Sequence, residues 1–156
     1  MDGPHPQLIE IEQRIAWFLA NPKFELCVIV EPESQSIVRF HIPTKSLRGY
    51  RDEKYGRRMA VELTPDEAVA GEAILTKMGF EQVGQRKGTF DGARNQVFPQ
   101  FEKQTTTARV AARDVLKVMD EVFGVGDAWL WTFHVDDPDQ WPDPLPKPAV
   151  WPPAGT

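Results

Sequence analysis

Leu63-Thr-Pro-Asp-Glu67 opens the segment that decides the fold of this chain, and Lys77-Met-Gly-Phe80 closes its first half. Thr64 suits the N-cap of a helix, a proline follows at the first helical position, and Glu67 can complete a capping box. Gly79 suits the left-handed position that follows a last helical turn. The pattern predicts a helix between Thr64 and Gly79. Its predicted packing face consists of Ala70, Ala73, Ile74 and Met78.

The second half of the segment runs from Phe98 to Val122-Phe-Gly-Val125. Phe98-Pro-Gln-Phe101 is predicted to be an aromatic turn. Residues 105–123 are predicted to form a long helix that ends at Gly124 or Gly126, because apolar residues recur there at helical spacing. The predicted stripe consists of Ala108, Ala111, Val115, Met119 and Val122. The whole segment contains no catalytic motif.

The flanking sequence adds one helix and several strands. Leu8, Ile11, Ile15 and Phe18 recur at spacings of three and four, which predicts a helix over residues 6–20. Four stretches rich in β-branched and aromatic residues predict strands: residues 24–30, 37–42, 58–63 and 128–135, with one irregular strand allowed within 81–95. We therefore expect an α+β fold, with an antiparallel sheet of about four to five strands packed against two or three helices. Residues 1–135 are expected to form one domain.

The composition changes after Asp136. Seven of the 14 prolines lie in residues 136–156, which excludes a helix or a central strand there. We expect this Pro/Trp-rich tail to be extended, and either strapped over the domain or free.

Length and charge restrict the class of protein. A chain of 156 residues can bury a core without disulfides, and Cys27 is the only cysteine. The formal net charge of −5 argues against a general nucleic-acid-binding surface. The first residues lack the pattern of a signal peptide, and no apolar run approaches the length of a membrane span. These observations lead us to expect a cytoplasmic protein with no membrane partner.

Basic residues nevertheless cluster between residues 39 and 58. The cluster could contact phosphate groups or an acidic protein, whereas a solvated loop that balances acidic residues elsewhere is the simpler interpretation. The candidate contacts are Arg48, Arg51, Arg57 and Arg58.

Catalytic interpretations find little support. His41, Glu62 and His134 each fall on the polar side of a predicted strand, so neighbouring strands could bring them together as an acid/base or metal site. Scattered polar residues on a half-exposed sheet face explain them more simply. No histidine or cysteine has the spacing of metal ligands, and Cys27 in an apolar strand is better explained as a small core residue. We expect no enzymatic activity, no metal and no cofactor.

Aromatic residues favour a binding function instead. Trp129, Trp131 and Phe133 alternate along the last predicted strand, and Trp141 and Trp151 follow in the tail. The strip could simply fill the core beneath the helices. It could also line a groove that captures an apolar peptide, with main-chain pairing at a sheet edge.

The motifs Lys77-Met-Gly-Phe80, Phe98-Pro-Gln-Phe101 and the helix closing in Val122-Phe-Gly-Val125 resemble the actinobacterial TY-Chap domains. These are relatives of the YbjN proteins and of type III secretion chaperones. The resemblance covers about residues 24–133, and the basic insertion at 44–56 and the Trp/Pro tail depart from the pattern. It implies an antiparallel α+β fold, no cofactor, a polypeptide client and frequent homodimers.

Three hypotheses follow from the sequence. The first is a non-enzymatic, chaperone-like module that binds a peptide or protein client in an apolar groove. The second is a small ligand-binding or enzymatic domain that uses polar residues on the open sheet face. The third is a basic-loop module that binds nucleic acid or an acidic protein.

Overall fold

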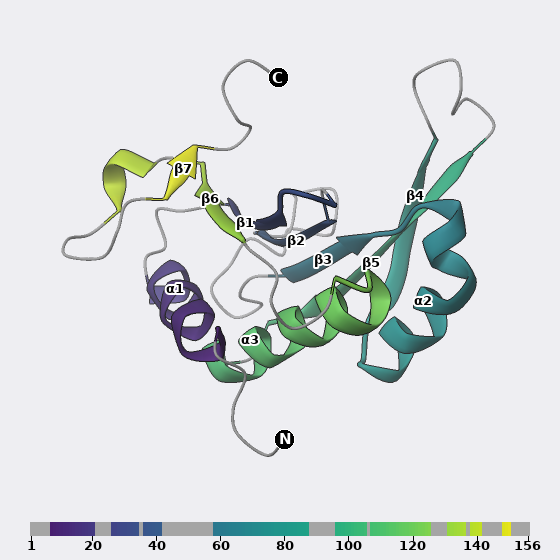
Figure 1. Cartoon of the computed structure of the whole chain (residues 1–156), viewed down its shortest axis with the longest axis horizontal. Helices are drawn as coiled ribbons and strands as arrows, with labels where there is room; N and C mark the ends of the chain where they lie inside the picture. Colours follow the sequence, from purple (N-terminus) through teal and green to yellow (C-terminus); the bar gives the residue numbers. More distant parts are fainter. Residues whose placement is uncertain are drawn as a thin grey trace.

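A computed structural model of the chain describes residues 7–20, 26–34, 36–41, 58–87, 96–105, 107–125, 131–136, 138–141 and 148–150. Its described elements are three α-helices, seven strands and two short helical segments, η3 (Val118–Val122) and η4 (Pro138–Gln140), and Figure 1 shows their arrangement. The helices are α1 (Leu8–Ala20), α2 (Pro65–Lys77) and α3 (Ala108–Lys117). The strands are β1 (Leu26–Glu31), β2 (Ser36–His41), β3 (Arg58–Glu62), β4 (Glu81–Lys87), β5 (Val97–Gln104), β6 (Thr132–Val135) and β7 (Ala149–Val150).

The strands form one sheet in the order β4-β5-β3-β2-β1-β6-β7. Every neighbouring pair is antiparallel except β6 and β7, which run parallel. In Figure 1, α1 and α3 lie beside each other below the sheet, and α2 lies at the right, next to β4 and β5. The expected α+β fold with an antiparallel sheet and three helices is therefore confirmed.

One face of the sheet is apolar and packs against the helices. Strand residues alternate between the two faces, so every second residue contributes to this side. The contributing strand residues are Cys27, Ile29, Val38, Phe40, Met59, Val61, Phe101, Phe133 and Val135, all buried in one cluster with helix residues. From α1 the cluster takes the predicted stripe of Leu8, Ile11, Ile15 and Phe18. Cys27 is a free, buried core residue, as the sequence predicts.

The caps of α2 agree with the sequence. Glu67 N–H donates to Thr64 Oγ1 at 3.2 Å, and Thr64 N–H donates to Glu67 Oε1 at 2.8 Å, which completes the capping box. At the other end Gly79 has a φ of 96°, and Phe80 N–H donates to the carbonyl of Leu75 at 3.0 Å. These are the bonds of a Schellman motif.

The packing face of α2 differs from the predicted one. Ala70 and Ala73 are exposed, whereas Gly71 and Leu75 are buried. A Cβ at Gly71 would lie 3.0 Å from Val122 Cγ1, so the missing side chain lets α2 approach the end of the third helix closely. α2 therefore packs with its Gly71 and Leu75 side toward the core and the end of the third helix. The positions of small residues along the sequence do not reveal which side this is.

The third helix follows its prediction and adds a local irregularity. α3 continues into a π-helical segment, η3 (Val118–Val122), where Phe123 N–H donates to the carbonyl of Val118 at 3.0 Å. Gly124 then adopts a φ of 67° and ends the helix, as predicted. Phe123 follows directly after this wider turn.

Lys103 on β5 ties three elements together. Its Nζ donates to Asp114 Oδ2 of α3 at 2.6 Å and to the carbonyl of Met78 at the end of α2 at 3.0 Å. The same ammonium lies 5.4 Å from the ring centre of Phe80. A cation suits the carboxyl end of a helix, where carbonyl groups lack intrahelical partners.

The sheet has more strands than expected, because residues 98–101 are not a turn. They lie inside β5, which pairs with both β3 and β4. Pro99 is tolerated there because its carbonyl accepts from Leu63 N–H at 3.0 Å. The nitrogen of Pro99 points to the same side, toward the point where β3 ends and the chain turns into α2. The missing N–H of the proline therefore removes no hydrogen bond between β3 and β5 within their paired residues.

The described parts of the tail are strapped onto the domain, one of the two expected arrangements. Trp141 is 5% exposed and packs edge-to-face on Phe133, with ring centres 5.4 Å apart. β7 pairs with β6 and forms the end of the described sheet. An edge strand tolerates the prolines that flank it in the sequence, because its outer side needs no backbone partner. The tail also contains one short 3₁₀ helix, η4 (Pro138–Gln140), so the expectation of no helix in residues 136–156 is wrong there. A proline is tolerated in the first turn of a helix, where its missing N–H is not needed.

We expect the close approach at Gly71 to govern the stability of the α2 contact. Gly71→Leu should lower the free energy of unfolding by at least about 1 kcal/mol, because overpacking outweighs the gain in helix propensity. Urea denaturation measures the loss. The matched control is Ala70→Leu on the exposed side of the same helix, which should stay within about 0.5 kcal/mol of the wild type. An unchanged unfolding midpoint for the Gly71 variant would contradict the packing described here.

Candidate functional site

The face of the sheet away from the helices carries most of the charged strand residues. In register across the sheet, Arg39 of β2 lies opposite Ala60 of β3, and Ala60 lies opposite Glu102 of β5. Arg58 and Glu62 lie two residues before and after Ala60 on β3, so their side chains point to the same face as Ala60. Because strands alternate, burial of the apolar side chains on one face sends these polar residues to the other.

The first charged group on this face centres on Glu102. Its carboxylate is bonded by His41 Nε2 at 3.1 Å and by Arg58 Nε at 3.2 Å. Burial acts to raise the pKa of Glu102, but the hydrogen bonds and charges of His41 and Arg58 outweigh it and hold this pKa below its ordinary value. Glu102 is therefore an ionised anchor for two cationic or polar neighbours.

The second charged group centres on Glu62. Arg86 of β4 donates from Nη2 and Nε to this carboxylate, with the shortest contact at 2.7 Å, and Gln100 Nε2 donates to it at 2.8 Å. Burial acts to raise the pKa of Glu62, and the bonds from Arg86 and Gln100 with the nearby charge of Arg39 bring it below its ordinary value. The hydrogen bond to Glu62 raises the pKa of Arg86.

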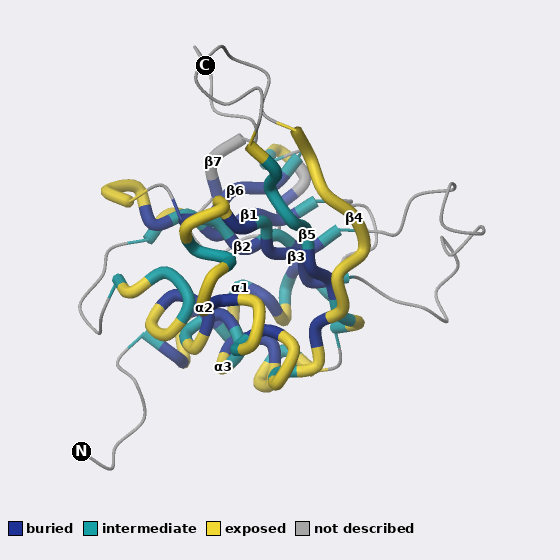
Figure 2. The backbone as a smooth tube through the Cα atoms, turned by 90° about the vertical axis from the view of Figure 1, so that its right-hand side faces the viewer, coloured by how far each residue is buried: buried dark blue, intermediate teal, exposed yellow. Residues whose placement is uncertain are grey.

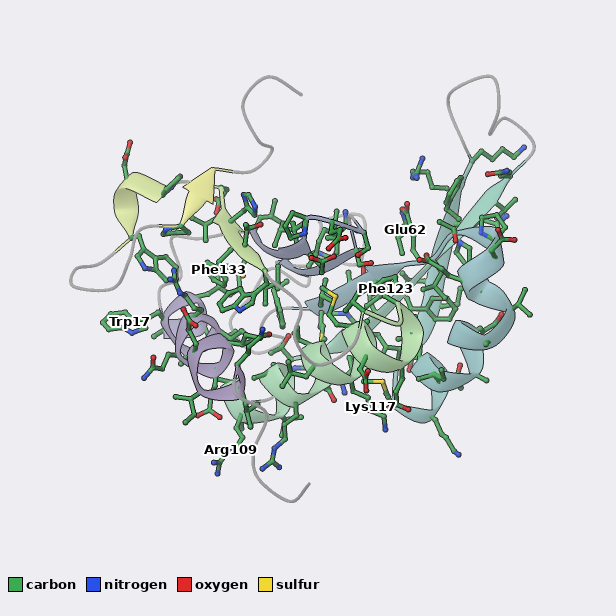
Figure 3. All side chains as sticks on the ribbon, viewed as in Figure 1. Trp17, Glu62, Arg109, Lys117, Phe123 and Phe133 are labelled. Carbon is green, nitrogen blue, oxygen red and sulfur yellow. The ribbon has the colours of Figure 1, made fainter. Side chains whose placement is uncertain are left out.

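A cavity of about 380 Å³ lies beside the second group. Its apolar lining consists of Ile37, Ala60, Leu63, Phe98 and Phe123. Its polar lining includes Ser34, Ser36, Arg39, Glu62, Thr64 and Arg86. Figure 3 labels two of the lining residues, Glu62 on β3 and Phe123 at the end of the third helix.

The proposed convergence of His41, Glu62 and His134 does not occur in the strand register. His41 lies opposite Arg58, four residues from Glu62 along β3, which corresponds to about 13 Å. His134 lies on β6, two strands from the β2 strand of His41. The spacing between strands alone separates the two backbones by about 10 Å, and any shift along the strand direction adds to this distance. Each side chain has a different partner, with Thr132 Oγ1 2.8 Å from His134 Nε2. The three share the expected face but lie beyond hydrogen-bond reach of one another.

The predicted aromatic anchors fall into three groups. Phe133 and Trp141 are each 5% exposed and belong to the core, so neither is available as an exposed peptide anchor. Trp131 is partly buried and packs against the same core. Trp129 and Trp151 lie outside the described residues. The described aromatic residues therefore support the core-filling interpretation of this strip.

Of the predicted basic patch, only Arg58 lies within the described residues, where it is bonded to Glu102. Arg48, Arg51 and Arg57 lie outside them. Within the described ranges, no group of three or more His, Cys, Asp or Glu side chains is arranged to hold a metal ion. The helices in those ranges fall short of the combined length and apolar character of a membrane span.

Comparison with protein-family models, curated proteins and solved structures gave no match. The resemblance to TY-Chap domains therefore stays a prediction from short motifs. What the chain does must be argued from its own geometry.

Sequence reasoning missed most of the residues that line the cavity. In the sequence Arg39 is only one member of a basic cluster, Arg86 falls in the segment 81–95 where an irregular strand is allowed, and Phe98 falls in the predicted aromatic turn. The alternation of Phe98, Gln100 and Glu102 was an available signal for β5. The proline at position 99 concealed that signal.

We expect Glu102 to make stability depend on pH in a defined direction. Glu102→Gln should lower the free energy of unfolding at neutral pH by about 1–3 kcal/mol, because it removes charge-assisted hydrogen bonds in a largely buried setting. The pKa of Glu102 is depressed in the folded state, so its contribution is present above the unfolded-state pKa and is lost as the pH falls. The difference from the wild type should therefore shrink below a pH of about 4.3, the ordinary value for glutamate.

Urea denaturation over a series of pH values measures this difference. Glu72→Gln, at an exposed position of α2 away from this face of the sheet, is the matched control and should change stability little at any pH. If the free energy of unfolding of the Glu102 variant stays equally far below that of the wild type at acidic pH, the loss comes from changed packing and not from the removed charge.

Proposed function

We propose that this chain is a non-enzymatic, chaperone-like module that binds a polypeptide client, and that the client pairs with the free edge of β4. The observation that carries the proposal is the exposure of all seven residues of β4, which Figure 2 shows in yellow along one side of the sheet. In the described part of the chain β5 is the single strand next to β4. An exposed sheet edge presents unpaired N–H and C=O groups, to which an extended peptide can add as a new strand.

The register identifies the outward backbone groups. Gln85 lies opposite Pro99, whose carbonyl is directed to Leu63 on the β3 side. Pro99 and Gln85 therefore form a pair whose backbone groups point away from each other. The N–H and C=O of Gln85 point to the free edge and are available to a client.

The irregularity of β4 limits the paired stretch. The register shifts between Gln82 and Gly84, and such a bulge disrupts regular pairing locally. The regular part runs from Gly84 to Lys87, so the client contributes a short extended segment. Lys87 disfavours a basic client residue directly opposite it.

The aromatic residues have a smaller part in this proposal than the sequence suggested. Phe133 and Trp141 stabilise the far side of the sheet, three or more strands from β4. A homodimer through β4 is a competing use of the same edge, since two copies could pair there antiparallel. The client and the second copy are distinguished by the test below.

Replacing Gln85 by proline tests the pairing directly. Gln85→Pro removes the outward N–H but no hydrogen bond between β4 and β5, so the fold should be retained. Peptides of about ten residues, the upper length of ordinary strands, can be selected from a displayed random library for binding to the wild type. We expect the proline variant to bind them at least about fivefold more weakly, the effect of one lost hydrogen bond.

The matched control is Gln85→Ala, which removes the side chain and keeps the N–H, and should bind as the wild type does. Hydrogen exchange should also slow at the β4 amides when peptide is added. Equal binding by all three proteins, or protection elsewhere than β4, would remove the proposal. A second copy at this edge would instead make the proline variant monomeric in sedimentation while the wild type is a dimer.

A further inference from the structure

The cavity beside Glu62 has a lining in which most charged groups are already paired. The Glu62 carboxylate binds Arg86 and Gln100, and the Arg86 guanidinium also lies 4.6 Å from the ring centre of Phe98. The Glu67 carboxylate closes the capping box on the backbone of Thr64. None of these groups is available to a ligand without the loss of an existing contact.

The serine hydroxyls at the edge of the cavity are directed toward Glu31. Ser34 Oγ donates to Glu31 Oε1 at 3.0 Å, and Ser36 Oγ lies 2.9 Å from Ser34 Oγ. Since the single proton of Ser34 goes to Glu31, Ser36 is the donor in the second contact. These hydroxyls therefore do not supply donors to the interior of the cavity in this arrangement.

Arg39 is the exception in this lining. Among the described residues its guanidinium makes no hydrogen bond or ion pair, although its charge reaches Glu62 through space. Arg58 and Arg86, which point to the same face, are each bonded to a carboxylate. The neighbours of Arg39 across the strands are Ala60 and Val28, and the small side chain of Ala60 leaves space above it.

We infer that this cavity binds an organic carboxylate, with the carboxylate held by Arg39 and an aryl or alkyl group held against Phe98, Phe123 and Ile37. A guanidinium offers two parallel N–H donors that match one planar carboxylate. The volume of about 380 Å³ lies in the range of small-molecule pockets, in which a few polar groups orient a mainly apolar ligand. The site lies beside β2 and β3, with further lining from the start of α2 and from Phe123, and it does not use the outward backbone groups of β4.

The charges of the lining distinguish a carboxylate from a phosphate. Glu62 and Glu67 both line the cavity and are both anionic groups near the site of Arg39. Arg86 is a second cation of the lining, so the two arginines and the two glutamates leave it without net charge. Arg39 is the one lining cation that has no carboxylate partner among the described residues, and it can offset a single negative charge, whereas the second charge of a dianion has no cation left to offset it. The structure therefore favours a singly charged ligand.

Titration with matched small molecules tests the inference. The probes are a set of aryl and alkyl carboxylates, such as 4-phenylbutyrate, each with its primary amide, together with phenyl phosphate. Binding to the full chain is followed by calorimetry and by NMR shifts of backbone amides. We expect at least one carboxylate to bind in the millimolar range or tighter, at least about tenfold more tightly than its amide and than phenyl phosphate.

Variants locate the effect. Arg39→Gln should abolish the preference for carboxylate over amide while the apolar part still binds weakly, and shifted amides in the wild type should belong to β2, β3 and the end of the third helix. Arg113→Gln, an exposed residue of α3 outside the cavity, is the matched loss of one positive charge and should bind as the wild type does.

Three results would overturn the inference. These are an unchanged preference in the Arg39 variant, tighter binding of phenyl phosphate, and the failure of every carboxylate to bind the folded wild type. A urea midpoint close to that of the wild type confirms that the Arg39 variant is folded when the comparison is made.

Discussion

A β-strand sends successive side chains to opposite faces, and this period of two is the constraint on which the rest of the structure depends. Once Ile29, Phe40 and Val61 are buried under α1 and α3, the residues between them must lie on the other face. That face therefore receives Arg39, Arg58 and Glu62. The apolar face stabilises the fold by burying surface, and the other face carries most of the charged strand residues.

The polar face is stable because its carboxylates are bonded. Glu102 holds His41 and Arg58, and Glu62 holds Arg86 and Gln100, so each anion has at least two donors. Both of these carboxylates have pKa values below the ordinary one for glutamate, because bonding to donors outweighs burial. Arg39 differs from Arg58 and Arg86 because its guanidinium has no carboxylate partner in the described part of the chain. Arg39 is left with this role because its cross-strand neighbour is Ala60, which has no charge to offer.

The helices and their ends were predictable because their signals are local. The capping box at Thr64 and Glu67 and the left-handed glycine at Gly79 involve residues close in sequence, and all appear as expected. The α2 packing face was not predictable in the same way, since it depends on how Gly71 meets Val122. β5 was mistaken for a turn because a proline in a central strand is normally excluded. It is accepted at position 99 because the neighbouring strand ends there.

The sequence by itself determined the fold class, the ends of α2 and the apolar stripes of α1 and α3, because these depend on spacing along the chain. Tertiary structure alone decided which polar residues meet. Glu102 reaches His41 across β3, and Arg86 reaches Glu62 across β5, through strand order and register that no local pattern encodes. The same strand order and register separate His41, Glu62 and His134, place Phe133 in the core, and leave β4 at an edge of the described sheet. Candidate sites on this sheet are consequently properties of strand pairing, which is a long-range interaction.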